Sequence, residues 1–147
     1  FARLKDMQAA AQLANVTLVD RVADSELDAL LSSADAWLIP YRKDVAGVSV
    51  PSRFYNLLAA GRPVILVSEP EAEAALTVSE NGLGWVVTPG RPDQLADAVR
   101  LASRSQDTGM AERAVATARS FSPERALASY AALVAELLSD RDVERTA

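Results

Sequence analysis

The residues with the clearest chemical potential lie in one short segment, residues 44–53, with the sequence DVAGVSVPSR. If a helix begins after Pro51, its first N–H groups have no partner within the helix, and the positive end of its dipole favours an anion such as phosphate. Ser52 adds a hydroxyl donor, and Arg53 adds a planar guanidinium that fits phosphate oxygens. Small residues before them let the backbone approach a ligand closely. The segment therefore predicts an anion-binding loop.

An ordinary connection within an α/β sheet explains the same segment. Proline is common in the first turn of a helix, and serine is a common capping residue. In that interpretation Ser52 caps the helix and Arg53 points into solvent. Residue types and spacing alone leave both interpretations open.

Three glutamates follow the next apolar run at residues 69, 71 and 73. Glu69 stands where it can accept hydrogen bonds from sugar hydroxyls. Acidic residues at the start of a helix also complement its dipole without any ligand. We favour that second interpretation for Glu71 and leave both open for Glu69 and Glu73.

Short apolar strands alternating with helices must hold these residues in place. The periodicity predicts strands over 16–19, 36–39, 63–67 and 84–87, and helices over 1–14, 24–33, the stretch between Pro51 and Gly61, 71–80, 93–103, 110–121 and 123–138. This alternation predicts an α/β fold with a parallel sheet, helices on both faces and right-handed crossovers. Ligands of such sheets bind beyond the carboxyl ends of the strands, which is where segment 44–53 falls.

Composition excludes several function classes. The chain of 147 residues has no cysteine and no histidine, which excludes disulfides, thiol or histidine catalysis and the common zinc sites. Its net charge of -5 does not favour a nucleic-acid partner. No apolar run reaches about 18 residues, so no membrane-spanning helix is predicted. The chain begins at Phe1 rather than Met, and we interpret it as a fragment, or a C-terminal half, of something larger.

Several spaced motifs, in order, resemble one known family. ADAWLIP, PSRFYNLLAAGRPVI and ENGLGWVVTPGRPDQLADAV are similar to the C-terminal nucleotide-sugar-binding domain of GT-B-fold glycosyltransferases. Glycosyltransferase family four, in the bacterial branch that builds surface polysaccharides, is the most similar. The resemblance covers residues 15–103 and implies a Rossmann-like domain over 1–139 that lacks its first strands. It leaves 140–147 as a flexible charged tail.

The resemblance also implies a donor site. In that family the diphosphate of a nucleoside diphosphate sugar lies against the helix start, which here corresponds to Val50, Ser52 and Arg53. The family commonly has a ribose-binding glutamate five residues before the glycine that matches Gly61. Asn56 occupies that position, and an amide hydrogen-bonds a ribose hydroxyl less strongly than a carboxylate.

Other positions would face the donor sugar. The family has a second glutamate near the start of the loop, and Asp44 is the nearest acid to that position. Gly47, Ser49 and Glu69 complete the sugar-side candidates. The family's basic pair lies on an earlier segment, which this chain lacks together with the acceptor domain.

The implied function is metal-independent transfer of a sugar, hexosyltransferase in type and retaining in stereochemistry, to a sugar, lipid or polysaccharide acceptor. The resemblance implies a cytoplasmic location, with the inner membrane face as an option through the missing N-terminal half. We expect this fragment by itself to be inactive. A non-catalytic GT-B-like binding or scaffold module is the alternative, and a nucleotide-sugar epimerase on the same fold is a third possibility.

Overall fold

The computed structural model describes residues 1–44 and 52–146, with side chains described up to residue 138. The chain divides into two compact units, Phe1–Leu30 and Leu31–Ala147. The domain bounds inferred from the resemblance, 1–139 and 140–147, stay a prediction. Within the described residues, no helix combines the length and the apolar character needed to cross a membrane.

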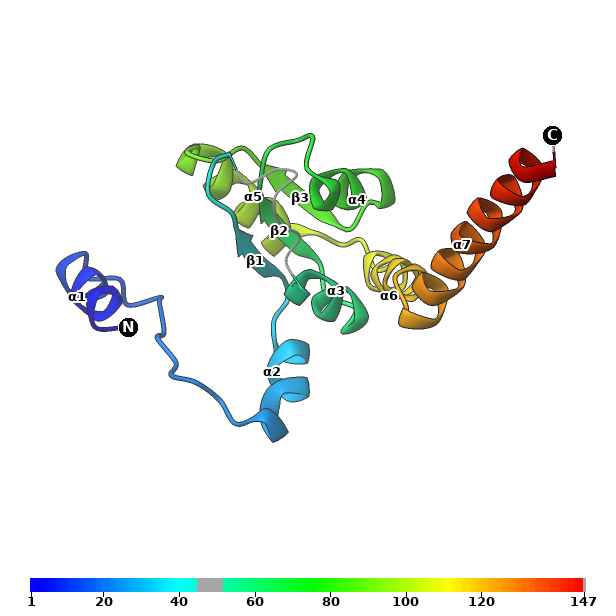
Figure 1. Ribbon diagram of the computed structural model, residues 1–147. Helices are drawn as coiled ribbons and strands as arrows, with labels where there is room; N and C mark the ends of the chain where they lie inside the picture. The colour runs from blue at the N-terminus through cyan, green and yellow to red at the C-terminus, as the bar shows by residue number, and fades with distance from the viewer. Residues whose placement is uncertain (45–51, 147) are drawn as a thin grey trace. The chain divides into compact units, whose positions relative to one another are not determined.

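A three-stranded parallel sheet forms the centre of the second unit (Figure 1). Its strands, in the order β1-β2-β3, are β1 (Trp37–Pro40), β2 (Val64–Val67) and β3 (Gly84–Val87). The pairs Trp37–Val64 and Val64–Gly84 set the register at the amino end. The middle strand is the continuous apolar run VILV, as expected of a strand that is covered on both faces.

Helices cover both faces of the sheet. Side chains alternate along a strand, so Val64 and Leu66 point to one face and Ile65 to the other. The first face packs on α3 (Ser52–Ala59), α4 (Glu73–Asn81) and α6 (Met110–Ser120), and the second face packs on α5 (Pro92–Arg104). The predicted α/β class, with a parallel sheet between two helical layers, is confirmed.

The last helix, α7 (Pro123–Thr146), is longer than the predicted 123–138. Its large apolar side chains are exposed, with Leu127 and Tyr130 each at 69%. Alanine, leucine, glutamate and arginine continue through its sequence, and no glycine or proline ends the helix after residue 138.

The first unit differs most from the sequence prediction. The helix expected over 1–14 is α1 (Ala2–Ala10), and Gln12 follows it with a left-handed φ of 50°. The strand predicted over 16–19 is wrong, because these residues form no regular element. A strand needs a neighbouring strand to satisfy its backbone, and the described residues of this unit contain none.

A short helical turn links the two units. It consists of the 3-10 turn η1 (Asp24–Glu26) and α2 (Leu27–Ser33). Leu27 is 41% exposed. Leu31, one turn later, packs against the core of the second unit.

Candidate functional site

The carboxyl ends of the strands place the predicted site residues at one edge of the sheet. The Tyr41 N–H, just after β1, donates to the Val67 carbonyl at 2.9 Å. The Ser68 N–H, just after β2, donates to the Val87 carbonyl at the same distance. These bonds extend the sheet by one residue and fix where each loop leaves it. We call this side the carboxyl edge.

Helix α3 brings Ser52 and Arg53 to this edge. Phe54, Leu57 and Leu58 are buried against the sheet, so the first turn of α3 has a fixed place, while Ser52 and Arg53 are exposed. No acidic residue lies in that first turn. Among the described residues Arg53 has no salt-bridge partner. The first N–H groups of a helix have no partner within that helix, and together with an exposed guanidinium they attract anions.

Tyr41 joins the site, although the sequence analysis missed it. Burial raises the pKa of its phenol above the ordinary value of 10.0, as does the charge that Tyr55 can carry, whereas Arg53 acts in the opposite direction. The Tyr41 hydroxyl is buried and has no hydrogen-bond partner in the described part of the chain. The available signal was a polar aromatic residue directly after the strand that ends at Pro40.

Tyr55 connects α3 to the start of α4. Burial raises the pKa of its phenol, and the negative charge of Glu73 raises it further. Its ring lies 5.5 Å from that of Phe54 and 4.9 Å from that of Phe121. Glu73 therefore faces Tyr55, on the same side as the carboxyl edge, and is the first residue of α4.

Glu69 contacts the segment that follows β1. Its Oε1 accepts a hydrogen bond from the Asp44 N–H at 2.5 Å, across 25 positions of the sequence. Asp44 has a left-handed φ of 64°. The other carboxylate oxygen, Oε2, is buried and lacks a partner among the described residues. The structure thus brings together Asp44 and Glu69, two of the sugar-side candidates.

The remaining predictions have different outcomes. Asn56 is exposed on α3, one helical turn after Ser52 and on the same face of the helix. Its role in ribose binding stays a prediction. Gly47, Ser49 and Val50 lie outside the described residues. In the described part of the chain, no three side chains of the metal-binding types come close enough to hold a metal ion.

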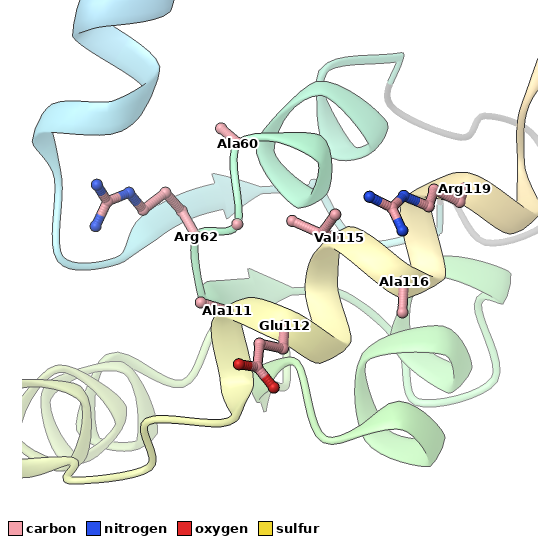
Figure 2. A pocket seen from close by; sticks show the side chains of 8 residues that line it. Ala60, Arg62, Ala111, Glu112, Val115, Ala116 and Arg119 are labelled. Atoms are coloured by element: carbon pink, nitrogen blue, oxygen red, sulfur yellow. The ribbon is translucent and has the colours of Figure 1, made fainter.

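A separate hollow lies at the other end of the sheet (Figure 2). Its volume is about 520 Å³, and it lies between the turn before β2 and helix α6. Figure 2 shows that Arg62, Glu112 and Arg119 point in different directions from its rim. Charged groups that diverge cannot converge on one ligand atom, so we place the candidate site at the carboxyl edge.

Comparisons with known proteins identify the family. The family described as Glycosyl transferases group 1 matches residues 2–104. The chain is 32% identical over 85 residues to the probable glycosyltransferase WbjE of Pseudomonas aeruginosa, covering 58% of this chain and 21% of that protein. This chain therefore spans about a fifth of the length of that relative. No solved structure matches the chain. The match over residues 2–104 covers most of the sequence, and the chain belongs to the group 1 glycosyl transferases.

Proposed function

We propose that the chain binds the donor of a glycosyltransferase that moves a sugar from a nucleoside diphosphate sugar to an acceptor. The observation that carries the proposal is the arrangement at the start of α3. Ser52 and Arg53 are exposed there, no acid lies in the first turn, and the nearby Tyr41 hydroxyl has no partner among the described residues. A diphosphate supplies the anionic oxygens that such a group of donors would bind.

The proposed chemistry is charge stabilisation at the leaving diphosphate. The bond between the sugar and the diphosphate breaks, and its electron pair stays on the phosphate oxygen. The acceptor hydroxyl oxygen forms the new bond to the sugar, and its proton passes to the leaving phosphate oxygen. Backbone N–H groups of α3 and the Arg53 guanidinium would stabilise the developing negative charge without a metal.

We propose that the enzyme transfers a hexose and that the transfer retains the anomeric configuration of the donor sugar. The acceptor would be a sugar, a lipid or a polysaccharide in surface polysaccharide or glycoconjugate synthesis. The relative is itself named a probable glycosyltransferase. We further propose that a second domain of the parent protein supplies the acceptor side, and that the parent acts in the cytoplasm.

Calorimetric titration with UDP and GDP tests the donor site. We expect at least one of them to bind, and Ser52→Ala with Arg53→Ala to weaken binding by about tenfold or more, because charge-assisted hydrogen bonds are lost. Arg100→Ala is the matched control, since Arg100 is an exposed arginine of α5, on the other face of the sheet. The idea fails if neither nucleotide binds, even to a longer protein that contains this chain.

A non-catalytic scaffold module is the second candidate function. It is favoured by one observation, that Asn56 and not a carboxylate occupies the exposed position on α3 one turn after Ser52. Asn56→Glu distinguishes the two. If the site binds donor ribose, the carboxylate should tighten nucleotide binding, whereas a scaffold should bind no nucleotide in either form.

A further inference from the structure

We infer that Glu69 is a positioning residue, whose carboxylate holds Asp44 in the orientation needed at the donor-sugar side of the site. The inference rests on the proposed function and deepens it. In it, Asp44 contacts the sugar and Glu69 acts through the Asp44 backbone. The two residues are 25 positions apart, and the sequence alone did not predict a contact between them.

Glu69 has a fixed base from which to act. Ser68, the residue before it, is only 2% exposed, and its N–H donates to the Val87 carbonyl at 2.9 Å. Glu69 itself follows β2, the central strand, whose residues Val64 and Leu66 are fully buried. Its carboxylate therefore extends from the most constrained part of the sheet toward the neighbouring strand.

Asp44 needs such a tether. Its φ of 64° lies in the left-handed region, which side chains with a Cβ rarely adopt, although aspartate adopts it more readily than most. A hydrogen bond of 2.5 Å from its N–H to a carboxylate opposes relaxation to an ordinary backbone conformation. The backbone conformation in turn decides where the Asp44 carboxylate points.

The loop that follows β1 is also held at its start, by a bond to β2. Tyr41 is bonded to Val67, which is two residues before Glu69. The chain between Tyr41 and Asp44 is thus attached to β2 and its extension at both of its ends. A short segment fixed at two points presents its last residue in one orientation.

The rival interpretation is that Glu69 contacts the ligand directly through Oε2, which has no partner among the described residues. Two variants separate the roles. Glu69→Gln keeps a carbonyl oxygen that can accept from the Asp44 N–H but removes the charge. Glu69→Ala removes the acceptor. If Glu69 positions Asp44, the glutamine variant should behave like the wild type and the alanine variant should not.

The first measurement is hydrogen exchange of the Asp44 amide in the ligand-free chain, followed by NMR. We expect exchange to be about tenfold faster in Glu69→Ala and nearly unchanged in Glu69→Gln, because only the former loses the acceptor. Glu71→Ala is the control, since Glu71 is an exposed glutamate two residues away. Equal exchange rates in Glu69→Ala and the wild type would overturn the tether.

The second measurement is a double-mutant cycle on binding of UDP-glucose and GDP-mannose. Glu69→Ala and Asp44→Ala should each weaken binding of the sugar nucleotide by about threefold to tenfold, and the double variant should be no weaker than Asp44→Ala alone. Additive losses, or a loss in Glu69→Gln equal to that in Glu69→Ala, would show a direct contact and overturn positioning. If neither sugar nucleotide binds the wild type, the role in donor binding fails with the proposed function, while amide exchange still decides the tether.

Discussion

The two edges of the sheet are built differently. At the opposite side, where the strands begin and which we call the amino edge, Arg113 of α6 donates to the Gly82 carbonyl at 2.9 Å and to the Asn81 carbonyl at 3.2 Å. Arg113 also pairs with Asp107 at 2.5 Å. One side chain thus satisfies the end of α4 and holds the connection between α5 and α6. At the carboxyl edge the Tyr41 hydroxyl and one Glu69 oxygen are buried without a partner among the described residues.

This difference distinguishes residues that support the fold from residues that are available to bind a ligand. Buried polar groups in proteins are nearly always hydrogen-bonded, so groups left without a partner cost stability and are kept where they serve a ligand or a catalytic role. The amino edge has its own exception, since Arg62 Nε is buried with no partner in the described ranges while its Nη2 donates to the Ser32 carbonyl. The carboxyl edge combines such atoms with a left-handed aspartate and an exposed arginine at a helix start.

The largest expected effect is at the amino edge, from Gly84→Ala. A Cβ at Gly84 would lie 1.9 Å from the Val64 carbonyl oxygen, and the residue has a φ of 150°. We expect the free energy of unfolding to fall by roughly 5 kcal/mol or more, because β2 and β3 cannot keep their register. Chemical denaturation measures this. Gly90→Ala is the control, since its φ is 79° but no atom of the described residues lies within 4 Å of a Cβ placed there. A Gly84 variant no less stable than the Gly90 variant would contradict the prediction.

Substitutions at two neighbouring residues of α3 should have different effects, one on the stability of the fold and the other on nucleotide binding. Phe54 is 1% exposed in the core, and Phe54→Ala should lower the free energy of unfolding by about 3–5 kcal/mol. Arg53→Ala should leave that free energy within about 0.5 kcal/mol of the wild type, since surface changes are usually this small, and should weaken UDP or GDP binding. Denaturation and calorimetry on both variants decide the matter. A stability loss in Arg53→Ala as large as in Phe54→Ala would remove the distinction between the two roles.

A smaller effect, dependent on pH, should come from Asp107. The hydrogen bond from Arg113 holds the pKa of its carboxyl below the ordinary value of 3.8. A carboxyl with a lowered folded pKa stabilises the fold above its unfolded pKa and loses this contribution as the pH falls through the folded value. Asp107→Asn should therefore lower the midpoint temperature of thermal unfolding at neutral pH. Below about pH 4 the midpoint temperatures of the variant and the wild type should differ less. An equal deficit at both pH values would contradict the assignment.

Tyr41→Phe should also change the stability only slightly. Removing a buried hydroxyl without a partner is nearly neutral or stabilising, so we expect a change within about 1 kcal/mol, alongside weaker nucleotide binding. Burial raises the pKa of the Tyr41 phenol, so the folded state favours the neutral phenol. The stability that depends on this neutral form is fully present below pH 10.0 and is lost as the pH rises through the pKa of the folded state. The phenylalanine variant should lose less stability at alkaline pH. A marked loss of stability at neutral pH would show that the hydroxyl supports the fold.

Most of the second unit was predictable from local sequence. The apolar run before Ser68 indicated β2, and Gly82 ends α4 in the left-handed conformation expected of a helix cap, with a φ of 60°. Residues 16–19 show the limit of such reasoning. Their β-branched composition favours a strand, yet they form no regular element, since a strand also depends on a neighbour to pair with.

The sequence by itself determined the alternation of strands and helices and placed Ser52 and Arg53 at the start of a helix, because hydrophobic period, proline and glycine act over a few residues. Only the tertiary structure decided that Tyr41 lies within reach of Arg53 and Tyr55, and that Glu69 bonds the Asp44 N–H. The physical reason is the parallel sheet. It brings the ends of strands that are far apart in sequence to one edge, where their side chains meet.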